Sequence, residues 1–332
     1  MHRIIHIGVG PLGQRIIGEL TERKLARVVA AVDSSSELAG KPLARFVPQF
    51  DEALTIAPSL EAVSDWSRFD AAMVTTSSDL VACADTFRAL LRQGKAVVST
   101  CEELVYPWLR HVGLAEELDA LAKRHGGRLL GTGVNPGFLM DHLPSVLTAV
   151  CKNVRTIKCL RIQDASSRRV PFQKKIGAGI TEAEFAKRVK DGTLRHVGLG
   201  ESLHFIAHYV GLKIERWEED IAPVLASRDL NCAIGPIAKG TPSGVRQTAR
   251  GYFDEHTVIE LEFQAAIGQS DPHDRVVIDA DPPIDCVIHG GVHGDLATSA
   301  IACNAIGRLL AAPPGLHTMA SIPSVVHAPS GK

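Results

Sequence analysis

The 332-residue sequence lacks a surplus of either charge, a CxxC motif and a long uninterrupted apolar run. Its 36 Lys and Arg residues balance 37 Asp and Glu residues, so no long-range field would draw the chain to nucleic acid or an anionic membrane. The seven scattered cysteines are odd in number, which argues against a disulfide framework and a four-thiolate zinc site. No apolar run reaches the roughly 18 residues that cross a bilayer. We therefore expect neither a nucleic-acid partner nor a membrane partner.

The first residues also lack the apolar core and small-residue cleavage site of a secretory signal peptide. Together with the scattered cysteines, which suit a reducing compartment, this absence predicts a cytoplasmic location. The length argues for more than one domain, because single hydrophobic cores stop growing at about 250–300 residues.

A spaced set of glycines directly follows the first apolar run. Residues 4–7 and 28–32 read as short buried strands, and residues 12–24 carry an apolar helical face between them. The turn Gly8-Val9-Gly10-Pro11-Leu12-Gly13 joins the first strand to the helix, and Asp33 follows the second strand twenty positions after the last glycine. A GxGxxG turn in this setting is the dinucleotide fingerprint of a Rossmann domain. The alternative is a glycine turn in an α/β domain that binds no nucleotide.

Each position of this turn has a physical reason. Gly8 allows a tight exit from the strand, Gly10 lets the backbone approach a pyrophosphate, and Gly13 lets the helix pack closely on the strand. Pro11 suits the first helical turn, where no N–H partner is needed. The helix N-terminus then offers N–H groups and a positive dipole end to the phosphates.

Asp33 bears on the choice between NAD and NADP. A carboxylate here accepts hydrogen bonds from the ribose hydroxyls of adenosine, which favours NAD. Ser34 and its two serine neighbours, with Lys41, would suit a 2′-phosphate if Asp33 turned aside. We favour NAD as the cofactor and keep NADP as the alternative.

Polar segments follow three further strands, at 71–74, 96–98 and 128–130. Ligands of a doubly wound sheet bind outside the carboxyl ends of its strands, so these segments and the glycine turn are expected to meet at one crevice. Helices are expected at 79–93 and 113–125. The expected cofactor contacts outside the glycine turn are Asp33, Ser34, Thr75, Thr76, Ser77, Thr100, Cys101 and Asn135.

From about residue 154 the pattern becomes rich in strands. Strands are expected at 154–162, 244–253, 257–266, 275–280 and 284–289, and helices at 181–190, 200–211 and 294–310. The predicted fold is α/β, with a Rossmann domain at 1–140 and an α+β domain with a mixed open sheet at 141–293. Residues 294–332 are expected to return to the Rossmann domain.

Residues 164–179 form an unusual stretch with four cations, one aromatic ring and two closely spaced glycines. One interpretation is a loop over the nicotinamide end that holds the substrate or phosphates. A solvated charged loop is equally compatible with the sequence.

Four motifs together resemble the 2,4-diaminopentanoate dehydrogenases and related native amine dehydrogenases, which are distant relatives of dihydrodipicolinate reductase. The motifs are the glycine turn, Ser-Thr-Cys-Glu-Glu-Leu at 99–104, Gly-Thr-Gly-Val-Asn-Pro-Gly-Phe at 131–138 and Pro-Phe-Gln-Lys-Lys-Ile-Gly-Ala-Gly at 171–179. The resemblance spans nearly the whole chain. It implies reversible oxidative deamination of an amine to a ketone and ammonia, with NAD or NADP as cofactor, in a homodimer formed through the strand-rich domain.

The resemblance places the active-site carboxylate at Glu102, with Glu103 as the alternative. Adjacent side chains in an extended segment point opposite ways, so one of the two faces the nicotinamide. Such a carboxylate would take a proton from the amine and stabilise the iminium charge. The expected substrate contacts are Phe138, Arg168, Gln173 and Lys174, with Arg168 and Lys174 suited to a substrate carboxylate.

The sequence is compatible with two other functions. One is reduction of an imine or of a dihydrodipicolinate-like ring, although residues 166–179 lack the histidine pair of dihydrodipicolinate reductase. The other is a dinucleotide-sensing protein without turnover. His204 and His208 share a helical face, but no third ligand accompanies them, so we expect no metal. Cys101 reads as packing beside the cofactor, because no partnered histidine supports a nucleophile.

Overall fold

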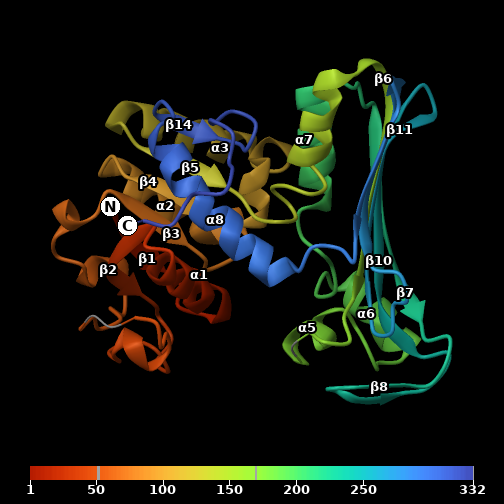
Figure 1. Ribbon diagram of the computed structural model, residues 1–332, viewed down its shortest axis with the longest axis horizontal. Coiled ribbons are helices and arrows are strands. Elements are labelled where there is room, and N and C mark those ends of the chain that lie inside the picture. Colours follow the sequence, from red (N-terminus) through yellow and green to blue (C-terminus); the bar gives the residue numbers. More distant parts are fainter. Residues whose placement is uncertain (51–52, 169, 332) are drawn as a thin grey trace. The chain divides into compact units, whose positions relative to one another are not determined.

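The computed structural model describes residues 1–50, 53–168 and 170–331. The chain divides into two compact units (Figure 1). Unit 1 comprises Met1–Phe138 and His293–Lys332, and unit 2 comprises Leu139–Val292.

Unit 1 is built on a six-stranded parallel sheet with the strand order β14-β5-β4-β3-β1-β2. β2 lies on one side of β1, and β3 and the later strands lie on the other side. This reversal of strand order is typical of a doubly wound sheet. The predicted Rossmann fold is therefore confirmed. The strands are β1 (His2–Ile7), β2 (Ala26–Val32), β3 (Ala71–Val74), β4 (Ala96–Ser99), β5 (Arg128–Gly131) and β14 (Gly315–His317).

Helices cover both faces of this sheet, which is why β3 and β4 consist of buried residues throughout. The helix from the C-terminal segment, α8, packs against α1 and β4, while α2 and α3 pack together. The helices of unit 1 are α1 (Pro11–Glu22), α2 (Leu80–Arg92), α3 (Val112–His125) and α8 (Gly294–Leu310). Short 3-10 helices are η1 (Leu43–Arg45), η2 (Leu60–Ala62), η3 (Trp66–Arg68), η4 (Glu102–Val105) and η5 (Pro107–Leu109).

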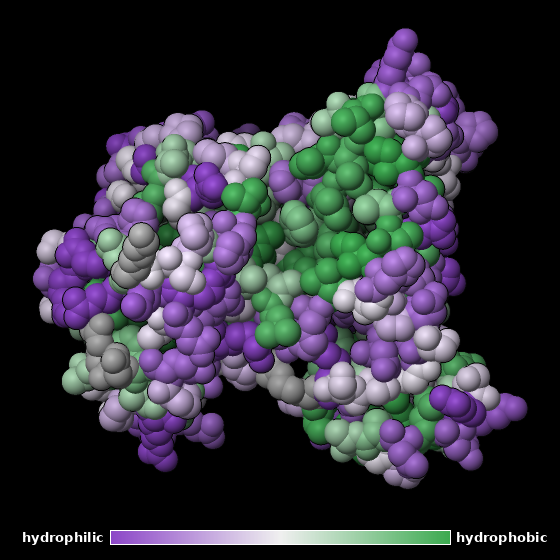
Figure 2. Space-filling model, viewed as in Figure 1, coloured by the Kyte–Doolittle hydropathy of each residue, from purple (hydrophilic) through white to green (hydrophobic). Residues whose placement is uncertain are grey.

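Unit 2 is built on a six-stranded mixed sheet with the order β13-β12-β6-β11-β10-β7. β6 and β11 run parallel and the other neighbours are antiparallel, which confirms the predicted mixed sheet. In Figure 2 the hydrophobic side chains of this unit gather around α7, and hydrophilic ones border the other side of the sheet.

The strands of unit 2 are β6 (Lys152–Asp164), β7 (Arg216–Leu225), β10 (Pro242–Phe253), β11 (His256–Ala266), β12 (His273–Asp281) and β13 (Ile284–His289), with a separate hairpin of β8 (Leu230–Cys232) and β9 (Gly235–Ile237). The helices are α4 (His142–Leu147), η6 (Thr148–Val150), α5 (Val170–Lys175), α6 (Glu182–Lys190) and α7 (Leu199–Val210).

Among the elements absent from the sequence prediction are α5, β7 and β14. The segment 164–179, predicted as a loop, contains the short helix α5; Arg169 in that stretch lies outside the described residues. The edge strand β7 contains Pro223, which an edge position tolerates because one side of the strand needs no ladder donor. β14 has only three residues and therefore too little sequence to show a period.

Candidate cofactor site and active-site carboxylate

The glycine turn leaves an open space in front of α1. Gly10 is the N-cap of this helix and supplies no side-chain cap, so the first N–H groups face outward. A Cβ built on Gly10 would meet no atom within 4 Å, whereas one on Gly13 would lie 2.0 Å from the Gly8 carbonyl oxygen. Gly13 is thus required by packing within the protein. Gly10 instead keeps a cradle open at a helix N-terminus, which fits a dinucleotide pyrophosphate.

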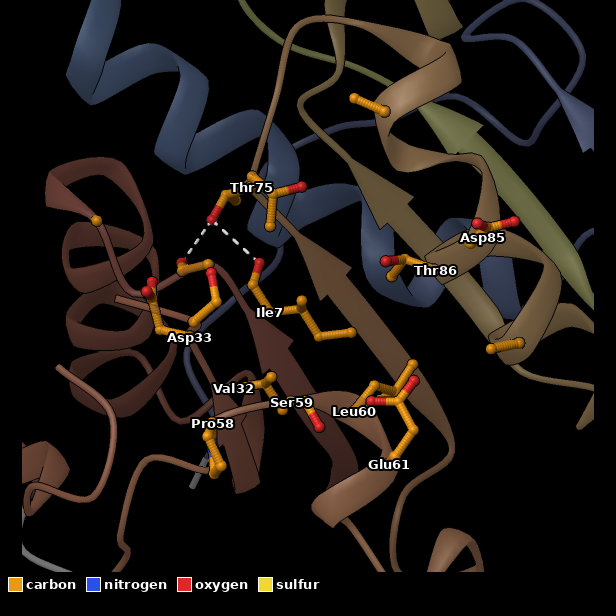
Figure 3. Close-up of a pocket in the computed structure, with 16 residues that line it drawn as sticks. Ile7, Val32, Asp33, Pro58, Ser59, Leu60, Glu61, Thr75, Asp85 and Thr86 are labelled. Atoms are coloured by element: carbon orange, nitrogen blue, oxygen red, sulfur yellow. Dashed lines mark hydrogen bonds between the residues drawn. The ribbon is translucent and has the colours of Figure 1, made fainter. Parts of the chain in front are cut away.

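A cavity of about 520 Å³ lies beside this turn, within unit 1 (Figure 3). Its walls come from the ends of β1 and β2, the segment 58–61, the start of the loop after β3, and α2. The volume lies in the range of small-molecule sites. Six residues expected at the cofactor or next to it line the cavity: Gly8, Gly10, Asp33, Ser34, Thr75 and Thr76.

The sequence interpretation missed one whole wall of the cavity. Pro58, Ser59, Leu60 and Glu61 line it from a segment without regular periodicity, and α2 contributes Ala82, Asp85, Thr86 and Ala89. In Figure 3 the hydroxyl of Thr86 points from α2 into the cavity, opposite the 58–61 segment. The sequence predicts the helix α2, but it does not single out residues 58–61, which have the composition of an ordinary loop.

The carboxylate of Asp33 is fixed at the cavity wall by two backbone donors. Val9 N–H donates to Oδ2 at 2.7 Å, and Ser35 N–H donates to Oδ1 at 2.8 Å. Lys41, the expected partner of a 2′-phosphate, donates instead to the Glu37 carbonyl. None of the described residues that line the cavity is Lys, Arg or His.

The residues that follow β3 and β4 differ in whether they contact the glycine turn and the cavity. The hydroxyl of Thr75 donates to the Gly8 carbonyl at 2.7 Å, so this threonine contacts the glycine turn directly. Ser77 accepts the Asp79 N–H and helps to start α2. Thr100 is half-buried and its N–H donates to the Val74 carbonyl, outside the cavity lining.

Cys101 is buried beneath the same loop. Its thiol donates to the Ser78 carbonyl at 3.2 Å. A hydrogen bond with Cys83, followed by burial, raises the pKa of the Cys101 thiol. A thiol held protonated in this way is a poor nucleophile, in line with a packing role.

The two adjacent glutamates of η4 occupy different environments. Glu103 is buried, and its Oε2 accepts the Leu80 N–H at 2.9 Å and lies 3.1 Å from Nε2 of His111. It therefore anchors the N-terminus of α2, where a carboxylate is favoured by the helix dipole. Glu102 is half-buried and lies three residues after Ser99, the carboxyl end of β4.

The segment 132–138 follows β5 and carries Asn135 and Phe138. Val134 N–H donates to the Thr298 hydroxyl, so α8 holds the segment in place within unit 1. Asn135 and Phe138 are both half-buried. Each lies at the carboxyl edge of the parallel sheet, as do the glycine turn and Glu102.

In unit 2, Gln173 has a structural task that its sequence motif did not suggest. It is fully buried, and its amide donates to the carbonyls of Ala165, Ser166 and Arg168, closing the loop before α5. The guanidinium of Arg168 lies over the Phe172 ring at 4.2 Å. Lys174 is exposed.

A buried arginine of unit 2 was also missed. Arg161 is 2% exposed, pairs with Asp274 at 2.7 Å and donates to the Val292 carbonyl. Nearby, burial lowers the pKa of His196 to about 3, and the charges of Lys175 and Arg161 add to this effect. This cluster cannot be recognised from the sequence, because its members lie on separate strands and loops.

His204 and His208 make ordinary contacts on α7. Nδ1 of His204 faces the Gly200 carbonyl at 2.9 Å, and its ring meets Trp217 edge-on. Within the described ranges, no group of three or more His, Cys, Asp or Glu residues is arranged to hold a metal. Over the same ranges, no helix is both long and apolar enough to cross a membrane.

The doubly wound sheet, the uncapped α1 and the acidic end of β2 define a dinucleotide-binding dehydrogenase fold. The model of the 2,4-diaminopentanoate dehydrogenase C-terminal domain matches residues 138–331. The 2,4-diaminopentanoate dehydrogenase of Acetoanaerobium sticklandii is 30% identical over 328 residues, 97% of this chain and 93% of that protein. The chain therefore belongs to the 2,4-diaminopentanoate dehydrogenase family, and it is an amine dehydrogenase-like enzyme.

Two further proteins extend this result. An amine dehydrogenase of Streptomyces virginiae is 25% identical over 267 residues, 73% of each chain. The structure of an amine dehydrogenase from Mycobacterium smegmatis shares the fold with a TM-score of 0.85 at 23% identity, covering 99% of this chain and 98% of that one. Dehydrogenases of this family typically use NAD(P).

Proposed function

We propose that this enzyme uses NAD to oxidise a primary amine to an imine, which water converts to a ketone and ammonia, and that it also runs in reverse. The main support for Glu102 as the reacting carboxylate is that Glu103 is already engaged by the Leu80 N–H of α2 and by His111. The names of the two relatives support the reaction class.

Each step of this reaction requires a specific action from residues of the chain. An ammonium has no lone pair to drive hydride out, so Glu102 first accepts a proton from it and releases that proton to solvent, which restores the carboxylate. The carboxylate then faces the positive charge that develops on nitrogen and stabilises it. In hydrolysis of the imine, Glu102 removes a proton from the attacking water. When bound, the nicotinamide supplies the hydride acceptor, and the α1 cradle with Asp33 holds the other half of the dinucleotide.

A substrate panel tests this function. Purified protein with NAD is offered 2,4-diaminopentanoate and simple alkylamines at alkaline pH, and with NADH it is offered ketones plus ammonia or dihydrodipicolinate. We expect NADH to form with a primary amine and to be consumed with a ketone and ammonia. Consumption with dihydrodipicolinate alone would contradict the proposal and favour a reductase. No turnover despite tight NADH binding would favour a sensing protein.

We propose Arg168 as the anchor of a substrate carboxylate. Its stacking on Phe172 orients the planar guanidinium for a two-point contact, and Lys175 and Arg161 add positive charge around His196 in the same unit. The expected effect of Arg168→Gln is a KM about tenfold to a hundredfold higher for a carboxylate-bearing amine, from the loss of a charge-assisted hydrogen bond. Simple alkylamines serve as the control substrates, and Lys174→Gln as the control variant. Equal losses on both substrate types would contradict the assignment.

We propose NAD rather than NADP as the preferred cofactor. Asp33 and Glu61 both line the cavity, and a hydrogen bond from Ser59 followed by the Glu61 backbone N–H holds the pKa of Glu61 below its usual value. Asp85, on the rim, is paired with Arg88. A 2′-phosphate would therefore face carboxylates, with no cation among the described residues that line the cavity.

The variant Asp33→Asn tests this preference. We expect it to reduce the NAD-to-NADP ratio of kcat/KM by about tenfold or more, because one repulsive charge is removed at short range. Asp85→Asn, whose charge already has a partner, is the matched control and leaves the ratio unchanged. A wild-type enzyme that prefers NADP would contradict the proposal at once.

A homodimer formed through the strand-rich domain, which is unit 2, remains a prediction of the resemblance, and a cytoplasmic location remains a prediction of the cysteine pattern. We propose the charged face of the unit 2 sheet as the dimer surface. That face carries rows of paired charges, among them Arg246–Glu262 and Lys158–Glu260. Sedimentation of wild-type protein and of Arg246→Glu would test the first; an unchanged monomer in both would contradict it.

A further inference from the structure

The middle of β1 contains a polar residue where the neighbouring positions are apolar. His6 stands between Ile5 and Ile7 and is fully buried. Burial lowers the pKa of its imidazole to about 4, so the ring is neutral at physiological pH and carries one N–H.

The contacts around His6 decide which nitrogen carries that hydrogen. Nε2 lies 3.3 Å from the Thr75 hydroxyl, and the same hydroxyl lies 2.7 Å from the Gly8 carbonyl oxygen. A hydroxyl has a single hydrogen, and the shorter contact to an oxygen that can only accept takes it. His6 Nε2–H therefore donates to Thr75, and Thr75 donates to Gly8. We assign this tautomer from the network. The imidazole also has a hydrogen bond with the Gly8 backbone, which partly offsets the effect of burial on the His6 pKa.

This arrangement leaves Nδ1 of His6 buried without a hydrogen-bond partner among the described residues. Such an atom is costly, and a leucine or methionine would fill the same space without that cost. The imidazole therefore requires a compensating role, and its donor chain ends on the glycine turn.

The position of the Gly8 carbonyl determines the shape of the glycine turn. Gly8 has a φ of +95°, and a Cβ there would lie 2.8 Å from the Thr75 carbonyl oxygen. The Gly8 oxygen also occupies the place that forces glycine at position 13. Its direction therefore sets the distance between the end of β1 and the first turn of α1, and with it the shape of the cradle.

We propose that His6 is a positioning residue for cofactor binding, which acts through the Thr75 hydroxyl to hold the Gly8 carbonyl and keep the α1 cradle in shape. The proposal rests on the cofactor-binding part of the proposed function and does not depend on the amine chemistry. Plain core packing is the rival explanation. It predicts a change in stability without a specific change in cofactor affinity.

The test compares two residues of similar length at position 6. His6→Gln keeps an N–H near the place of Nε2, while His6→Met fills the space without a donor. NADH affinity is measured from cofactor fluorescence in the absence of amine, and the melting temperature of each apo variant is measured alongside. We expect His6→Met to weaken NADH binding about tenfold and to raise the KM for NAD more than it lowers kcat, whereas His6→Gln restores most of the affinity.

A double-variant cycle shows whether the effect passes through Thr75. Thr75→Val removes the hydroxyl and Thr75→Ser retains it. If the chain is as proposed, His6→Met adds no further loss of affinity to Thr75→Val. Additive losses would overturn the route through Thr75. Equal NADH affinity in the Met and Gln variants would overturn the proposal, whatever their melting temperatures.

Should His6→Met fail to fold, the Thr75 pair still decides the matter, because Thr75→Val with unchanged NADH affinity excludes the bracing chain. These readings need no amine substrate. Failure of the substrate panel with normal NADH binding would overturn the amine chemistry and leave this proposal standing.

Discussion

Replacement of Glu102 by Gln is expected to lower turnover by about a hundredfold to ten-thousandfold, the range of general acid–base catalysis. The amide fills the same volume but cannot accept the proton of the ammonium, and it brings no charge to face the iminium. Affinity for NADH is expected to stay close to that of the wild type, because the cradle at α1 and Asp33 are untouched. Steady-state oxidation of a responsive amine, combined with NADH fluorescence, measures both quantities.

Glu103→Gln is the matched control for this experiment. It removes the charge that Glu103 places at the N-terminus of α2, next to the Leu80 N–H and His111. We expect a loss of stability of about 0.3–2 kcal/mol and a modest effect on turnover. Glu103→Gln should therefore have the lower melting temperature of the two variants, and Glu102→Gln the lower kcat. A folded Glu103→Gln enzyme without turnover, beside an active Glu102→Gln enzyme, would reverse the two roles.

The parts of this molecule that the sequence predicts well are those with a local physical cause. The glycine turn is recognisable because a strand, a tight exit and a helix follow one another within a few residues. The ends of β3, β4 and β5 are recognisable because short buried strands stop at polar residues. The separate duties of Glu102 and Glu103 are only half visible. The alternation of an extended segment, expected at these two residues, does not apply, because both lie in the 3-10 helix η4. The partner of Glu103 comes from α2, which is distant in sequence.

The features that the sequence does not reveal depend on contacts between distant segments. The 58–61 wall becomes part of a cavity only because α2 lies opposite it. Arg161 finds Asp274 across neighbouring strands, and Gln173 turns back on its own loop rather than outward. His6 is a further case. In the sequence it looks like one polar interruption of a buried strand, and its partner Thr75 lies 69 residues away.

The second large effect is expected from Gly10→Ala, because Gly10 is open on the side where the protein has no atoms. The new methyl group meets nothing within 4 Å in the protein, so the fold and its melting temperature should be preserved. A pyrophosphate in the cradle would meet the methyl group, and this overpacking is expected to weaken NADH binding by roughly tenfold to a hundredfold. NADH fluorescence and a thermal melt of the same sample separate the two effects.

Two other glycine variants give this experiment its controls. In Gly13→Ala the methyl group would lie 2.0 Å from the Gly8 carbonyl oxygen, so this variant should lose stability as well as affinity. In Gly113→Ala it enters open space at an exposed position of α3, so both quantities should stay near the wild-type values. Of the three variants, only Gly10→Ala is thus expected to lose NADH affinity while it keeps its stability. A Gly10→Ala protein that binds NADH normally would show that the phosphates do not lie at the α1 N-terminus, and the dinucleotide would then have to be placed elsewhere along the sheet edge.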